Sequence, residues 1–228
     1  MNTLNKLERW ILAYVFVTVL LGVYLAIFNQ PYFDQSYTIE DGFLEWLTVI
    51  GLTATASVCT ARVIQLAGHR SPLFLLVTAL VALLFFCAAG EEISWGQRLF
   101  NVQSSEFFRA HNAQSETNLH NLVVDGTKVN KLIFGRILGL VFACYFLVLT
   151  PLYHKNKKIA AWVNALGIPI PKWQHLVSYF LVLILIEGVI HHFSPTLKRG
   201  EMTECAIAFI VFLNVYSPFN EAIFLQRH

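Results

Sequence analysis

Six stretches of mostly apolar residues, separated by shorter polar segments, dominate the pattern along this chain. A helix that crosses the hydrocarbon core of a bilayer needs about 20 apolar residues. Each stretch approaches that length, so the pattern predicts an all-α, polytopic membrane bundle with about six transmembrane helices. The stretches are Trp10–Phe28, Leu44–Ala67, Leu73–Ala89, Leu132–Tyr153, Leu176–Ile190 and Cys205–Phe224.

The segment between the third and fourth stretches, residues 90–131, has no long apolar run. Its larger apolar residues, such as Phe107, Phe108 and Leu122, recur at irregular helical spacing. We expect one or two short helices here that lie at the membrane interface.

The composition supports a membrane protein and excludes a nucleic-acid-binding one. Only 13% of the 228 residues are charged, whereas soluble domains carry about 25%. The net charge of +2 is too small to indicate a nucleic-acid partner. The length favours a single integral membrane domain. The first apolar run is longer than the hydrophobic region of a signal peptide, about 7–15 residues, so it predicts a retained span.

Basic residues near the ends of the stretches predict the orientation. The cluster of Lys155, Lys157 and Lys158 favours a cytoplasmic loop between the fourth and fifth spans. Both termini are then cytoplasmic, and we expect a multi-pass protein of a bacterial inner membrane. In this topology the ionisable residues near span ends gather at the outer end of the bundle.

Two adjacent carboxylates and a guanidinium directly follow the third apolar stretch. They are Glu91, Glu92 and Arg98, and charges at membrane depth are costly and usually mark a site. If the helix continues, Glu91, Ser94 and Arg98 share one face. The functional interpretation is an acid/base carboxylate beside an arginine that binds an anion. The alternative is a structural Glu–Arg pair at the end of the bundle.

A second polar group lies at residues 116–121. On a helix, Glu116 and His120 would share a face at i,i+4 spacing, which lets a carboxylate orient an imidazole or lets both bind a metal. An ordinary polar loop is the alternative. Three further acids lie near other span ends and are candidates for the same pocket: Asp41, Glu45 and Glu187.

Residues 90–98, Gly-Glu-Glu-Ile-Ser-Trp-Gly-Gln-Arg, and 116–121, Glu-Thr-Asn-Leu-His-Asn, resemble the signature of an uncharacterised family of bacterial multi-pass membrane proteins. A fainter likeness is to VanZ-type proteins, which belong to a set of small membrane bundles proposed to act on lipid headgroups or lipid-linked phosphates. That resemblance implies site positions at Glu92, Gln97, Arg98, Glu116 and Asn121.

The leading hypothesis is an intramembrane enzyme that acts on a lipid headgroup or a lipid-linked substrate at the outer interface, so that membrane lipids are its expected partners. The candidate catalytic residues are Glu91, Glu92, Glu116 and His120. The candidate substrate-binding residues are Arg98, Gln97, Ser94, Asn118, Asn121, Glu187, Asp41 and Glu45. All of them are expected to converge in one pocket.

Two alternatives remain open. One is a metal-dependent, ceramidase-like membrane hydrolase, with a divalent metal held by residues drawn from Glu91, Glu92, Glu116, His120, Glu187 and His191. The other is a non-catalytic membrane subunit, or a carrier that binds an ion or proton. A membrane-protein partner or a homo-oligomer fits either function class.

Overall fold

The computed structural model describes residues 3–124, 127–129, 137–196 and 198–225. Most of the described residues are helical. Its α-helices are α1 (Lys6–Phe28), α2 (Gln30–Tyr32), α3 (Phe43–Leu66), α4 (Pro72–Glu92), α5 (Glu106–His111), α6 (Leu138–Ala143), α7 (Thr150–Lys155), α8 (Lys157–Ala165), α9 (Trp173–Leu183), α10 (His191–Phe193) and α11 (Gly200–Tyr216). Shorter π- and 3₁₀-helical segments are Phe33–Tyr37, Ser94–Gly96, Cys144–Leu149, Ile184–Ile190 and Glu221–Phe224.

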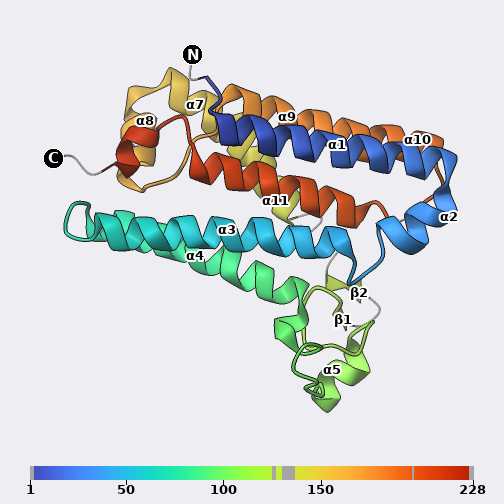
Figure 1. Cartoon of the computed structure of the whole chain (residues 1–228). Coiled ribbons are helices and arrows are strands. Elements are labelled where there is room, and N and C mark those ends of the chain that lie inside the picture. Colours follow the sequence, from blue (N-terminus) through green and yellow to red (C-terminus); the bar gives the residue numbers. More distant parts are fainter. Residues whose placement is uncertain (1–2, 125–126, 130–136, 197, 226–228) are drawn as a thin grey trace. The chain divides into compact units, whose positions relative to one another are not determined.

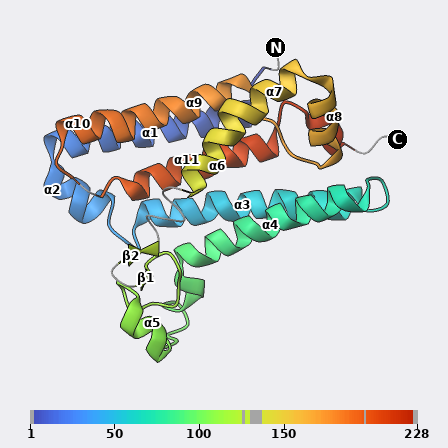
Figure 2. The ribbon, with the colours of Figure 1, turned by 180° about the vertical axis from the view of Figure 1, so that it is seen from behind.

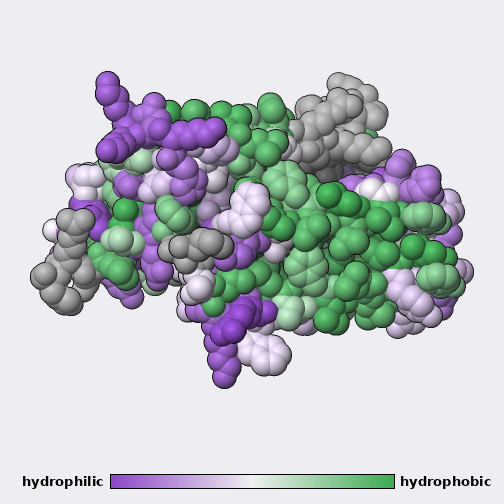
Figure 3. All heavy atoms as spheres, turned by 90° about the horizontal axis from the view of Figure 1, so that it is seen from above, coloured by the Kyte–Doolittle hydropathy of each residue, from purple (hydrophilic) through white to green (hydrophobic). Residues whose placement is uncertain are grey.

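Within the described residues, five helices are long and apolar enough to cross a membrane: Lys6–Phe28, Phe43–Leu66, Pro72–Glu92, Leu138–Lys155 and Trp173–Phe193. The last two run through π-helical segments that join α6 to α7 and α9 to α10. These five overlap the first five predicted stretches, although residues 132–136 of the fourth lie outside the described part. Many large apolar side chains on these helices are exposed, and hydrophobic residues cover much of the face shown in Figure 3.

The sixth predicted stretch, Cys205–Phe224, is shorter as a helix than its composition suggested. Helix α11 ends at Tyr216, and Glu221–Phe224 is a separate 3₁₀ turn. Pro218 interrupts the run, and a proline cannot donate the backbone hydrogen bond that a continuing helix needs. At 17 residues, α11 is not one of the five spanning candidates.

The chain divides into two compact units. The first comprises residues up to 85 and from 164 onward, and the second comprises residues 86–163. In the first unit, α11 packs along α3 and also contacts α1 and α9 (Figure 1). Gly51 permits the close approach of α3 to α11, because a Cβ there would meet the Cβ of Ala208 at 3.1 Å. Most of the inward face of α11 is therefore buried.

The second unit begins with the last turns of α4 and continues into an irregular segment that carries α5 and a minimal antiparallel pair, β1 (Val123–Val124) and β2 (Thr127–Lys128) (Figure 2). The six-residue helix α5 agrees with the prediction of one or two short helices in this segment. The strand pair was not predicted, because two-residue strands leave no period-2 pattern in a sequence.

Candidate functional site

The third spanning helix ends at Glu92 rather than continuing to Arg98. Ser94, Trp95 and Gly96 follow in the left-handed region, with φ of 48°, 56° and 73°. This conformation is uncommon for residues other than glycine and is often held in place at functional sites. The predicted helical face shared by Glu91, Ser94 and Arg98 is therefore wrong.

Glu116 is the centre of the segment that follows. Its carboxylate forms a bidentate ion pair with Arg98, at 2.8 Å to Nε and 3.1 Å to Nη2. It also accepts a 2.5 Å hydrogen bond from the Ser94 hydroxyl, which in turn accepts one from Asn118 Nδ2 at 2.7 Å. Ser94 and Asn118 are buried, so the left-handed turn is held by side chains from residues more than twenty positions later.

Residues 116–121 are not helical, so the predicted i,i+4 pairing of Glu116 with His120 on one helix face is wrong. The physical reason is that Glu116 is bound to Arg98 and Ser94. His120 lies in a turn and is partly exposed.

Glu91 ties the end of α4 to the same loop. Trp95 Nε1 donates to one carboxylate oxygen at 2.8 Å, and the backbone N–H of Leu119 donates to the other at 2.5 Å. The second bond brings residues 119–120 to the end of α4, where Glu92 is the last helical residue. The structure thus joins the two sequence motifs, although not through the helical pairings that their spacing suggested.

Neutral side chains complete the network. Gln97 donates to Ser104 Oγ at 2.7 Å and accepts from the Thr117 backbone at 2.8 Å. Asn118 Oδ1 accepts from Asn112 Nδ2 and from the backbone of Asn121. Of the predicted substrate-binding residues, Ser94, Asn118 and Asn121 therefore hold the loop together.

An open pocket of about 380 Å³ lies against this network. Two arginines and neutral polar groups line it, and its lining contains no carboxylate: Gln97, Arg98, Asn101, Val102, Gln103, Ser104, Arg109 and Ser115. The Arg109 guanidinium has no ion-pair partner among the described residues, whereas Arg98 is paired with Glu116. Two guanidinium groups beside one carboxylate favour an anionic ligand.

Arg109 and the other lining residues between Asn101 and Ser104 were not among the predicted site residues. The available signal was a second arginine, eleven positions after Arg98, in a polar segment next to a span. Its role depends on how the irregular loop folds back, which spacing alone does not reveal.

The remaining predicted site residues belong to the first unit, where each has contacts of its own. Glu187 accepts from Arg199 Nε at 2.7 Å and from Thr203 Oγ1 at 3.0 Å. Glu45 is buried and accepts from the backbone N–H of Asp41 at 2.6 Å. Their convergence with Glu91 and Arg98 stays a prediction.

The first unit also holds carboxylates near the start of α11. The pKa of Glu201 is raised to about 8, chiefly by burial and also by the neighbouring carboxylates of Glu204, Glu45 and Glu40, while Lys198 partly offsets the rise. Glu201 lies outside the five candidate spans. This arrangement links the stability of the fold to pH.

The free energy of unfolding is expected to fall as pH rises from about 5 to about 8. In this window the folded protein keeps the Glu201 proton, whereas an unfolded chain releases it near 4.5, so rising pH favours unfolding. Thermal unfolding of detergent-solubilised protein across these pH values measures the slope. Glu201→Gln should flatten it, and exposed Glu106→Gln should leave it unchanged. An identical slope in wild type and Glu201→Gln would refute this assignment.

A charged cluster that the sequence did not reveal lies buried where α1 and α9 begin. Lys172 Nζ donates to both carboxylate oxygens of Glu8, at 2.8 and 3.0 Å, and to Ser217 Oγ at 2.8 Å. His175 Nε2 is 3.0 Å from Glu8 Oε1. Glu8 and His175 are fully buried and Lys172 is 4% exposed. The cluster connects the start of α1 and the start of α9 with the end of α11.

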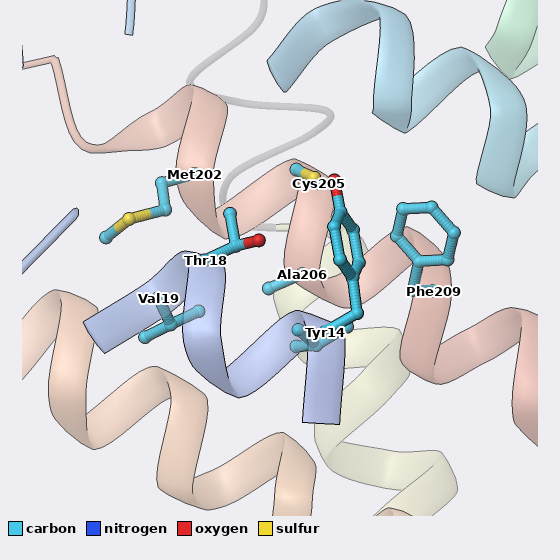
Figure 4. A pocket seen from close by; sticks show the side chains of 8 residues that line it. Tyr14, Thr18, Val19, Met202, Cys205, Ala206 and Phe209 are labelled. Atoms are coloured by element: carbon cyan, nitrogen blue, oxygen red, sulfur yellow. The ribbon is translucent and has the colours of Figure 1, made fainter. Parts of the chain in front are cut away.

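A small cavity between α1 and α11 is a weaker candidate for a ligand site (Figure 4). It holds about 10 Å³, about the least volume that admits one water molecule, between side chains that include Tyr14, Met202 and Phe209. Its volume excludes an organic substrate in this conformation.

Among the described residues, no group of three or more His, Cys, Asp or Glu side chains is arranged to hold one metal ion. The metal-dependent alternative therefore rests on the sequence alone.

No protein-family model, curated protein or solved structure matches the chain.

Proposed function

We propose that this membrane protein is an enzyme that acts on a phosphate-bearing lipid headgroup or lipid-linked substrate, and that the pocket of Arg98 and Arg109 binds the phosphate. The observation that carries the proposal is the pocket itself, in which two arginines and neutral polar side chains surround about 380 Å³ of open space. It follows an apolar helix long enough to cross a bilayer, so the bilayer surface is the nearest source of ligands.

Arginine suits this task because its planar guanidinium forms paired hydrogen bonds with phosphate oxygens. Glu116 fixes the plane of the Arg98 guanidinium through two contacts. Arg109 supplies the charge that no described carboxylate neutralises. In this proposal Arg98 orients the phosphate and Arg109 contributes most of the net attraction.

The chemical step needs a proton-transfer group near the pocket. Glu91 and Glu116 accept hydrogen bonds on both carboxylate oxygens, which suits residues that position the loop. Leu119 and Glu91 are joined by a hydrogen bond, and His120 and Glu92 are the residues that directly follow them in the chain. We assign them the acid/base role, because a carboxylate and an imidazole are the groups most often used for it.

Binding is the first test. Full-length protein in amphipol is titrated with short-chain phosphatidylglycerol, and the dissociation constant is measured by calorimetry. Arg109→Ala and Arg98→Ala should each weaken binding by about 10- to 100-fold, because a charge-assisted hydrogen bond contributes about 1.5–3 kcal/mol. Exposed Arg9→Ala is the matched control and should bind as wild type does. Unchanged affinity in both pocket variants would refute the proposed binding site.

Catalysis is tested separately by mass spectrometry of lipids incubated with wild type, Glu92→Gln or His120→Ala. Loss of product formation with affinity within about threefold of wild type would support the acid/base assignment. Equal turnover in wild type and both variants would overturn it while leaving phosphate binding intact.

A further inference from the structure

Large apolar side chains are exposed in the same loop that forms the phosphate pocket. Leu99, Phe100, Val102 and Phe107 are 64%, 77%, 59% and 53% exposed. They alternate along the chain with the polar residues that line the pocket, and Val102 itself contributes to the lining. Exposed apolar groups clustered within nine residues indicate a binding surface rather than a water-facing loop.

The turn that presents these side chains is held by backbone hydrogen bonds. Phe100 N–H donates to the Gly96 carbonyl at 3.0 Å, and Val102 N–H donates to the Gln97 carbonyl at 2.9 Å. Gly96 has φ of 73° and lies under the Phe100 ring, where a Cβ would come within 3.0 Å of it. The apolar groups therefore project from an ordered turn, so little conformational entropy is lost when they are covered.

Chain connectivity keeps this turn within reach of the end of a candidate spanning helix. The spanning helix ends at Glu92, and Leu99 is seven residues later, a reach of at most about 25 Å even if fully extended. The contacts of Arg98 with Glu116 and of Leu119 with Glu91 fold the segment back toward that helix end. Apolar side chains beside arginines near the end of a spanning helix would suit a leaflet surface, where acyl chains lie beneath phosphate groups.

We infer that the pocket binds an acylated membrane phospholipid, with its phosphate between Arg98 and Arg109 and its acyl chains against Leu99, Phe100 and Val102, which insert into the leaflet. The inference rests on the proposed phosphate site and adds the acyl chain as a required part of the ligand. A water-soluble phosphate ester would offer the same charge but leave the apolar side chains uncovered.

The experiment compares two ligands with one headgroup. Short-chain phosphatidylglycerol and its deacylated form, glycerophosphoglycerol, are titrated into full-length protein in amphipol, which avoids free detergent micelles. Wild type should bind the acylated ligand at least tenfold more tightly. The double variant Leu99→Ser/Phe100→Ser, at two exposed residues outside the pocket lining, should lose most of this gain in affinity and bind the deacylated ligand within about twofold of wild type. Phe193 is an aromatic residue of α10 that is 63% exposed. The control variant Phe193→Ser should keep the higher affinity for the acylated ligand.

The outcomes separate the two proposals. The acyl-chain inference would be overturned if wild type bound both ligands with equal affinity, or if the double variant kept the wild-type preference for the acylated ligand. Neither result would contradict phosphate binding by the two arginines. Arg109→Ala should weaken both ligands in parallel, and failure of that variant to affect either one would instead refute the phosphate site. Circular dichroism of every variant confirms that the comparison is made between folded proteins.

Discussion

Lys172→Ala is expected to lower the free energy of unfolding by about 3–5 kcal/mol, because it leaves the Glu8 carboxylate buried without its cation. Glu8 is fully buried, and the ammonium of Lys172 satisfies both of its oxygens. A buried charge that loses its partner costs more than the pair contributes when intact. Thermal unfolding in detergent, followed by circular dichroism, measures the loss.

The matched controls separate burial of charge from loss of a side chain. Exposed Lys158→Ala removes the same group from a helix surface and should change stability by less than about 0.5 kcal/mol. The double variant Glu8→Gln/Lys172→Met should be more stable than Lys172→Ala alone, because no unpaired charge remains. If the double variant is no more stable than Lys172→Ala, the unpaired Glu8 charge is not the source of the effect.

Hydropathy predicted the spanning helices well because run length and apolar composition are local properties. The five candidate spans overlap predicted stretches for this reason. The cluster of Glu8, Lys172 and His175 was missed because Glu8 and Lys172 are 164 positions apart. Part of the signal was present, since Asn5 and Glu8 form a capping box that is readable as a helix start.

The sequence indicated the two motifs but not the geometry of their contacts, and it missed Arg109 of the pocket. The two motifs do meet, through Glu116 with Ser94 and Arg98, and through Leu119 with Glu91. Helical spacing was the wrong guide, because Glu116 and Asn118, more than twenty positions away, hydrogen-bond to Ser94 and hold it in a left-handed turn. A local propensity cannot forecast a conformation that contacts across the loop impose.

Glu116→Ala is expected to weaken phosphatidylglycerol binding by about 10- to 100-fold, although Glu116 does not line the pocket. The carboxylate holds the Arg98 guanidinium through two contacts and accepts the hydrogen bond of buried Ser94. Without it, Arg98 loses its fixed orientation and the left-handed turn loses its anchor. Calorimetry measures the affinity, and hydrogen exchange over residues 94–118 should become faster.

Two further variants make the test specific. Glu116→Gln keeps an acceptor for Ser94 but removes the charge that pairs with Arg98, so its loss of affinity should be smaller than that of Glu116→Ala. Glu106→Ala removes an exposed carboxylate from the same unit and should leave affinity and exchange unchanged. Wild-type affinity and unchanged exchange in Glu116→Ala would show that the ion pair does not position Arg98. Weakened binding together with faster exchange would show that the two motifs act through the contacts that join them.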